Sequence, residues 1–163
     1  MKYDIIIKMI TVTVILALTA CSSVDDITSN YPYISKLTNT ECIKAFTHNS
    51  EIDSDTDHGT FKMTLEGTSA KCKFTSLYYP CDFGKVNIKV SYKEGVLSIV
   101  EYPSSDKADC RCETDATFIV ENIPYGDFIL KIYHGDINGK FNEDSPKYIG
   151  KIELVDGGLS IPY

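Results

Sequence analysis

The stretch KVNIKVSYKEGVLSIVEY, residues 85–102, decides the fold class of this chain. In its first half, polar residues alternate with apolar ones, and the apolar members are Val86, Ile88, Val90 and Tyr92. This two-residue period places one face of a strand in a core and the other face in water. Lys93-Glu94-Gly95 then supplies a turn, and residues 96–102 return as a partner strand. The stretch therefore predicts an antiparallel β-hairpin.

Similar strand patterns surround the hairpin. Phe61, Met63 and Leu65 alternate with polar residues in the same way. Further strands are predicted at Cys72–Tyr79, Thr117–Asn122, Phe128–His134 and Tyr148–Val155. About seven strands separated by turn residues are typical of an all-β protein, here an antiparallel β-sandwich of the immunoglobulin-like or prealbumin-like kind, with a small barrel as the alternative.

One short helix is expected ahead of these strands. Thr38-Asn39-Thr40-Glu41 has the spacing of a capping box, in which two side chains bond the free backbone N–H groups of a helix start. Cys42, Ala45 and Phe46 would then share one helical face. These residues predict a helix of about two turns near the start of the domain.

The first 20 residues have the features of an export signal. Lys2 and Lys8 provide positive charge, and Met9–Ala20 is a short apolar run. A run of 12 residues is too short to cross a ~30 Å hydrocarbon layer as a helix. Residues 1–20 are therefore expected to be a signal peptide rather than a membrane span.

The end of this run resembles the lipobox of bacterial lipoproteins, since it reads Leu18-Thr19-Ala20-Cys21. The resemblance implies that Cys21 carries a thioether-linked diacylglycerol, and two or three acyl chains hold a protein on a membrane stably. Ser22 follows, rather than the aspartate that retains many Gram-negative lipoproteins in the inner membrane. Asp25-Asp26 resemble the acidic surface-export signal of Bacteroidetes lipoproteins. The expected location is the outer membrane, with the cell surface as a further option.

The chain is expected to have three parts. Residues 1–20 form the signal peptide, residues 21–40 a flexible lipid-anchored tether rich in Ser, Asp, Asn, Thr and Pro, and residues 41–163 the β-sandwich domain. The folded part is long enough for one domain with a core of ordinary size.

Five cysteines remain once Cys21 carries lipid, and an exported protein is expected to form disulfides with them. Cys72 and Cys81 lie at opposite ends of one predicted strand, so they should not pair. The next two strands bring the loop with Cys110 and Cys112 to the end that holds Cys81. The preferred bridge therefore joins Cys81 to Cys110 or Cys112. The second predicted bridge joins Cys42 to Cys72.

Two acidic loops and one cysteine pair raise the question of metal binding. Asp53, Asp55 and Asp57 match positions 1, 3 and 5 of a calcium loop, but His58 replaces its glycine and Thr64 its bidentate glutamate. The second loop, DINGKFNED at residues 136–144, also suits a plain connection between strands. The Cys-x-Cys pair lacks the spacing and the second pair of a structural zinc site. We predict no metal site.

The sequence carries no recognised catalytic signature. Its histidines are His48, His58 and His134, and it contains neither a GxSxG elbow nor an HExxH motif. Two carboxylates placed for glycoside hydrolysis cannot be identified from sequence, because their separation in space decides their role. We therefore expect no enzyme and no cofactor, with a small hydrolase using acidic residues as the alternative.

The charge of the chain argues against one class of partner. Its net charge is −7, whereas nucleic-acid binding needs a basic stripe. The expected partners are a membrane, through the N-terminal lipid, and a protein or glycan whose identity the sequence leaves open.

Residues 109–133, DCRCETDATFIVENIPYGDFILKIY, resemble a pattern in small Bacteroidetes outer-membrane lipoproteins, in which Cys-x-Cys, a strand, a glycine turn and a second strand follow one another. The NigD-like lipoproteins carry a similar C-terminal stretch. The resemblance implies a β-sandwich on a lipid tether and implies no activity. The expected function is that of a non-enzymatic binding or accessory module of the cell envelope, and a purely structural envelope protein is a further alternative.

Overall fold

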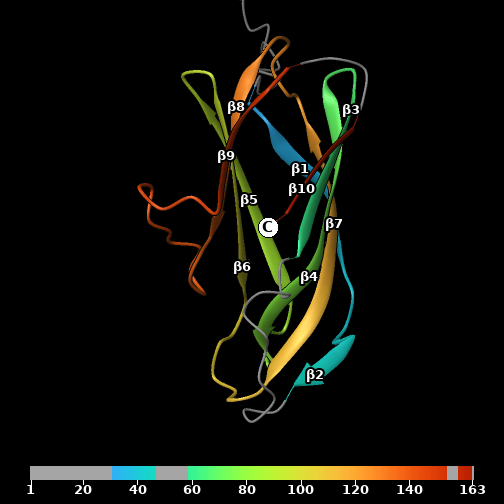
Figure 1. Ribbon diagram of the computed structural model, residues 1–163, viewed down its shortest axis with the longest axis vertical. Coiled ribbons are helices and arrows are strands. Elements are labelled where there is room, and N and C mark those ends of the chain that lie inside the picture. The colour runs from blue at the N-terminus through green and yellow to red at the C-terminus, as the bar shows by residue number, and fades with distance from the viewer. Residues whose placement is uncertain (1–30, 47–58, 154–157, 163) are drawn as a thin grey trace, which may run out of the picture. The chain divides into compact units, whose positions relative to one another are not determined.

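The computed structural model describes residues 31–46, 59–153 and 158–162, and every regular element within them is a β-strand (Figure 1). The ten strands are β1 (Tyr33–Asn39), β2 (Lys44–Phe46), β3 (Thr60–Glu66), β4 (Ser69–Pro80), β5 (Val86–Lys93), β6 (Val96–Pro103), β7 (Arg111–Glu121), β8 (Phe128–His134), β9 (Tyr148–Ile152) and β10 (Gly158–Pro162).

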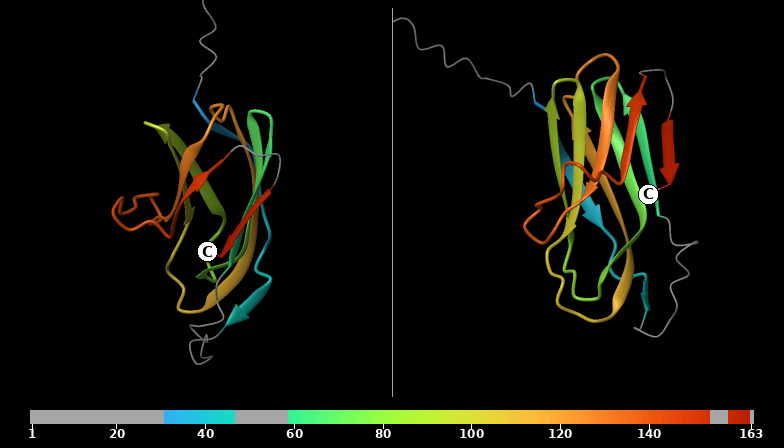
Figure 2. Two further views of the ribbon diagram at one scale, coloured as in Figure 1. Left: turned by 45° about the horizontal axis from the view of Figure 1, so that its top comes forward. Right: turned by 60° about the vertical axis from the view of Figure 1, so that its left-hand side comes forward.

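The strands form two sheets that pack face to face, which confirms the predicted β-sandwich (Figure 2). The first sheet has the order β1-β7-β4-β3-β10, and β2 adds to β7. The second sheet has the order β5-β6-β8-β9. Neighbouring strands pair antiparallel in both sheets except for β6 and β8, which are parallel.

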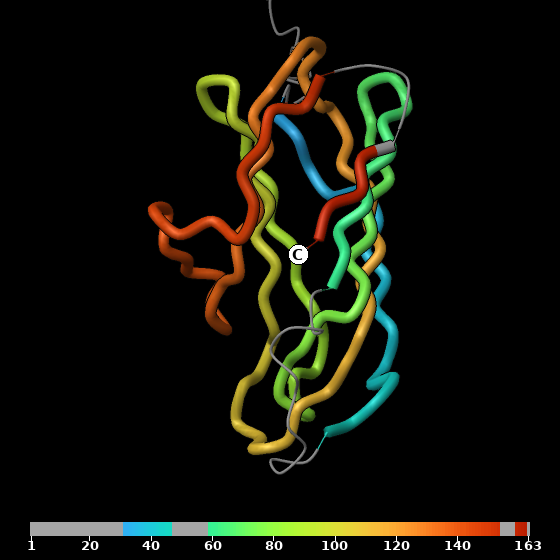
Figure 3. Tube along the Cα trace, in the orientation of Figure 1, coloured from blue at the N-terminus to red at the C-terminus, as the bar shows by residue number. Residues whose placement is uncertain are grey.

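The parallel pair follows from the path of the chain. After β6 the chain crosses at one end of the sandwich to β7 in the first sheet, and after β7 it crosses back at the other end to β8 (Figure 3). Two crossings reverse the direction twice, so β8 runs the same way as β6. The resulting register places Glu101 opposite His134.

The hairpin of residues 85–102 forms as the sequence predicts. Its strands are β5 and β6, and the register runs from Val86 opposite Pro103 to Lys93 opposite Val96. Glu94 and Gly95 make the two-residue turn, and both have positive φ, 52° and 80°. Positive φ at both positions is the geometry whose twist matches that of the flanking strands.

The core lies between the sheets and is filled by the inward members of each alternation. Phe61, Phe74 and Phe118 are fully buried, on three neighbouring strands of the first sheet. The ring centroids of Phe61 and Phe74 are 4.7 Å apart, and those of Phe74 and Phe118 are 5.8 Å apart. Burying each ring stabilises the fold by about 1.5–3 kcal/mol relative to leaving it exposed.

The predicted helix is wrong. Residues Lys44–Phe46 form β2, and Asn39 still belongs to β1. The backbone N–H groups of Thr40 and Ile43 donate to the carbonyl oxygens of Asp115 and Glu113, at 3.0 and 2.8 Å. Strand β7 thus supplies the hydrogen bonds that a helix would have made internally, and pairing with a distant strand overrides the local capping signal.

The sandwich also begins earlier than the sequence predicts. Residues 21–40 are predicted to be a tether, but β1 pairs with β7 from Tyr33 to Asn39. The Asn39 side-chain amide then donates to the Val86 carbonyl oxygen in the second sheet, at 3.0 Å. Residues 31–40 are therefore part of the folded domain.

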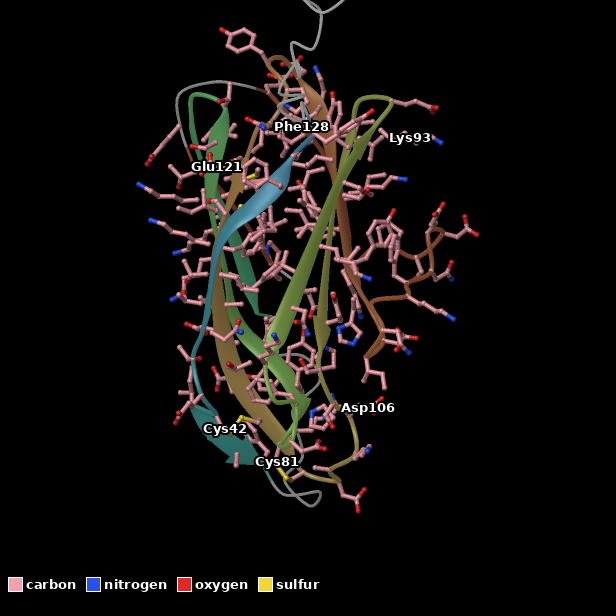
Figure 4. All side chains as sticks on the ribbon, turned by 180° about the vertical axis from the view of Figure 1, so that it is seen from behind. Cys42, Cys81, Lys93, Asp106, Glu121 and Phe128 are labelled. Carbon is pink, nitrogen blue, oxygen red and sulfur yellow. A yellow bond between two sulfur atoms is a disulfide. The ribbon has the colours of Figure 1, made fainter. Side chains whose placement is uncertain are left out.

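Two disulfides close one end of the sandwich, where Figure 4 labels Cys42 and Cys81. Cys81 pairs with Cys110, which confirms one of the two predicted partners, Cys110 and Cys112. The predicted bridge from Cys42 to Cys72 is wrong, because Cys42 pairs with Cys112. Cys72 faces the core of the sandwich, away from this end, and remains a buried free thiol. Burial raises the pKa of that thiol to about 12.

Candidate functional site

A buried carboxylate lies between the two sheets. On β6 the inward residues are Leu97, Ile99 and Glu101, so the alternation that buries the two aliphatic side chains also buries the acid. Glu101 is only 1% exposed. Burying a charge without a partner costs free energy, and buried ionisable groups cluster at functional sites. The surroundings of Glu101 are therefore the candidate site.

His134, the last residue of β8, is the partner of this carboxylate. Its Nδ1 lies 2.7 Å from Oε1 of Glu101, and the imidazole side chain is 47% exposed. Tyr79, on β4 of the opposite sheet, stacks on the imidazole with ring centroids 5.7 Å apart. The pair therefore connects the core to the surface, with the carboxylate inside and the imidazole at the rim.

The hydrogen bond from Glu101 raises the pKa of His134 above its ordinary value of 6.5. Partial burial lowers that pKa, the negative charge of Glu101 raises it further, and the positive charges of Lys147 and Arg111 lower it. Because the raising effects win, the imidazolium is stabilised and forms an ion pair with the carboxylate.

A carboxylate–imidazole pair can serve as a proton donor and acceptor, or it can activate a nucleophile that is hydrogen-bonded to the imidazole. Within the part of the chain that the structure describes, no hydrogen bond joins His134 to a serine, threonine or cysteine side chain. The geometry supports an ion pair that responds to pH, with one face open to solvent.

A second cluster of acidic groups lies on β7, where Glu113 and Asp115 point to the same side. Both carboxylates bind Ser76 of β4: its hydroxyl donates to Glu113 Oε1 at 2.7 Å, and its backbone N–H donates to Asp115 Oδ1 at 3.1 Å. Lys73 also forms an ion pair with Asp115 at 2.9 Å. These carboxylates fix an irregularity in β4, so their arrangement is explained by structure rather than catalysis.

The loop of residues 136–144 uses its first acid to hold its own backbone. Asp136 Oδ1 accepts from the backbone N–H groups of Asn138 and Lys140, at 2.8 and 2.9 Å. The bonds from Lys140 and Asn138 lower the pKa of Asp136. Lys89 of β5 donates to the Asn138 carbonyl oxygen at 3.1 Å, which ties the loop to the sheet. The acidic loop is therefore a turn stabilised by the Asp136 carboxylate.

Several residues singled out in the sequence fall outside the described part of the chain. These are Cys21, His48, Asp53, Asp55, Asp57 and His58. In the described residues, no three His, Cys, Asp or Glu side chains converge as a metal site would require. The described residues contain no helix that is long and apolar enough to span a membrane.

Sequence reasoning recognised His134 as a histidine but missed its partner. One signal was available, because Glu101 occupies an apolar position of the β6 alternation. The pairing itself depends on two strands brought together through the opposite sheet. No protein-family model, curated protein or solved structure matches this chain.

Proposed function

We propose that this protein is an exported lipoprotein, anchored in the outer membrane through lipid on Cys21, whose β-sandwich is a non-enzymatic binding or accessory module of the cell envelope. The observation that carries the proposal is the distribution of the six cysteines. Four are paired in two disulfides and Cys72 is buried in the core. The sixth, Cys21, ends the lipobox-like sequence Leu18-Thr19-Ala20-Cys21 and lies outside the described residues.

The disulfides support export. Such bonds persist in oxidising compartments and are rare in the reducing cytosol. Both bridges cross between chain segments that are far apart in sequence, with separations of 70 and 29 residues. A domain built in this way is suited to the periplasm or the cell surface.

A binding role is favoured over hydrolysis by the way the acids are used. The carboxylates of Glu113 and Asp115 hold Ser76 in place, and Asp136 closes a turn. Glu101 is buried against His134, with no nucleophile bonded to that imidazole in the described residues. A sandwich that presents loops at both ends on a rigid framework is well suited to bind a protein or a glycan.

Replacement of the lipidated cysteine tests the proposal. Cells producing Cys21→Ser should show no incorporation of labelled palmitate into this protein, and the protein should leave the membrane fraction or remain unprocessed. The matched control is Cys72→Ala, which removes a cysteine outside the lipobox and should keep its label. Palmitate labelling and membrane retention that survive in Cys21→Ser would contradict the proposal.

A further inference from the structure

We infer that one end of the sandwich rests on the lipid surface, with the side chain of Tyr125 inserted among the lipid headgroups. The inference rests on the proposed lipid anchor at Cys21. The surface concerned, called the tip end below, consists of the loop 122–127, the turns at 67–68 and 94–95, and the start of β1.

Hydrogen bonds hold the parts of the tip end together. The Ile123 N–H donates to the Thr68 carbonyl oxygen at 2.8 Å, and the Ile129 N–H donates to the Gly95 carbonyl oxygen at 2.9 Å. Tyr33, at the start of β1, lies opposite Glu121. Figure 4 labels Glu121, Phe128 and Lys93 at this end, whereas the disulfide residues Cys42 and Cys81 lie at the opposite end.

Tyr125 lies in the loop 122–127 of the tip end, and 93% of this residue is exposed. Such exposure is unusual for a large aromatic residue. Its loop is nevertheless fixed. Ile123, two residues earlier, is buried in the core, and Gly126 has a φ of 112° that turns the chain behind the tyrosine. The buried Ile123 and the turn at Gly126 therefore hold the Tyr125 ring in an outward position.

Two more tyrosines are exposed at the tip end, Tyr31 at 71% and Tyr33 at 49%. Tyrosine combines an apolar ring with a polar hydroxyl, and it is enriched where proteins meet the headgroup layer of a membrane. Three exposed tyrosines at one end of the sandwich therefore form a surface that suits the headgroup layer of a membrane.

The length of the preceding chain places the tip end next to the bilayer. Nine residues separate Cys21 from Tyr31, and the ten Cα–Cα steps between these two residues can span at most about 33–36 Å. Strand β4, with 12 residues, is about 40 Å long, so the disulfide end lies roughly one strand length further along the sandwich. A domain attached at Tyr31 therefore meets the membrane most readily with its tip end.

The charged residues in and next to the tip end indicate which lipids it would meet. Lys151 pairs with Asp127 at 2.9 Å and with Glu153 at 3.2 Å. Lys71 pairs with Glu66, and Lys93 lies beside Glu94. The acids outnumber the lysines in these pairs, so anionic lipid would repel this end and a zwitterionic phosphocholine or phosphoethanolamine surface would suit it.

The absence of tryptophan from the sequence offers a direct test. Tyr125→Trp creates a single fluorescent reporter at the tip end, and Ile43→Trp creates a matched control at the disulfide end, where Ile43 is 56% exposed. Both variants are prepared as lipidated full-length protein on phosphatidylcholine vesicles, with and without brominated lipid. Tyr125→Trp should show blue-shifted emission and loss of intensity to the brominated lipid, and Ile43→Trp should show neither.

The outcomes separate the inference from the proposal on which it rests. Flotation of the vesicles measures anchoring independently of fluorescence. If both variants float and Tyr125→Trp is quenched no more than Ile43→Trp, the docked tip end is wrong and the lipid anchor stands. If the protein does not float, both ideas fail. Anionic vesicles should give weaker quenching of Tyr125→Trp than phosphatidylcholine, and stronger quenching there would refute the assigned lipid chemistry.

Discussion

At the scale of single residues, the bond between Glu101 and His134 couples folding to pH. The hydrogen bond with Glu101 raises the pKa of His134 in the folded protein above the ordinary value of 6.5. The folded state therefore holds this proton more tightly than the unfolded chain does. The resulting stabilisation is fully present below the ordinary pKa and is lost as the pH rises through the raised one.

The free energy of unfolding should accordingly fall as the pH rises from the ordinary value of 6.5 through the raised pKa, because the imidazolium that pairs with Glu101 loses its proton. Denaturant unfolding at a series of pH values measures this fall in the wild type and in His134→Gln, where the fall should be smaller. A Glu101→Gln variant keeps a hydrogen-bonding side chain but no charge, and its His134 should titrate at a lower pKa by NMR. An unchanged pH profile in His134→Gln would rule out the coupling.

At the scale of strands, β4 contains a bulge within the first sheet. The pairing of β4 with β7 shifts register between Phe74 and Leu77, and Ser76 has a φ of 55°. A non-glycine residue rarely adopts such a φ, and here Glu113 and Asp115 compensate by binding Ser76. Gly59, the residue before β3, lies close to this bulge, against the backbone carbonyl groups of Thr75 and Ser76.

Gly59→Ala should destabilise the protein by about 1–3 kcal/mol, because the added methyl group would overlap the carbonyl oxygens of Thr75 and Ser76. The matched control is Gly150→Ala on β9, where the added methyl group would meet the hydroxyl and outer ring atoms of Tyr148, a side chain that can shift more readily than backbone. Its effect should stay within about 0.5 kcal/mol. Guanidinium unfolding measures both, and equal midpoints for the two variants would show that the close approach at Gly59 is unimportant.

The strands show where sequence reasoning works and where it fails. Strand β8 has its predicted bounds, and β4 contains the whole predicted strand Cys72–Tyr79. Strand β7 contains the predicted strand Thr117–Asn122 except for its last residue, and it begins earlier, at Arg111. These strands are predictable because a two-residue period is a local signal. The bulge also has a signal in the sequence, because the apolar residues at 70, 72 and 74 are followed by 77 and 79, which breaks the two-residue period. By contrast, β2 and the parallel pairing of β6 with β8 depend on partners distant in sequence, which no local pattern specifies. For the same reason, no local pattern in the sequence predicts the pairing of Glu101 with His134.

At the scale of the whole molecule, the two ends of the sandwich have different chemistry. One end is closed by the disulfides Cys42–Cys112 and Cys81–Cys110. The other end carries the exposed Tyr125. The Cys42–Cys112 bridge holds the segment that leads from β1 into β2 against β7, and the Cys81–Cys110 bridge joins the end of β4 to the start of β7.

Each disulfide should contribute several kcal/mol by restricting the unfolded chain. With separations of 29 and 70 residues, chain-entropy reasoning gives about 3–4 kcal/mol for Cys81–Cys110 and about 4–5 kcal/mol for Cys42–Cys112. Double replacement by alanine of either pair should lower the denaturation midpoint accordingly, and reduction of the native protein should act in the same direction.

Non-reducing peptide mapping provides the control for these variants. The wild type should yield the peptide pairs 42–112 and 81–110 and a free Cys72, and Cys72→Ala should leave both pairs intact. Recovery of Cys72 in a mixed disulfide, or of unlinked thiols in exported protein, would overturn the connectivity.

The parallel neighbours β6 and β8 also have a kinetic consequence. The β5–β6 hairpin is local and can form within about 1–10 μs, as isolated hairpins do. Strand β8 joins β6 only after the chain has passed through β7, and their contact at Glu101 and His134 spans 33 residues. Folds dominated by such distant pairings take milliseconds to seconds to form. During that interval one edge of β6 is open to strands of other chains, so aggregation while the newly exported protein folds should start there.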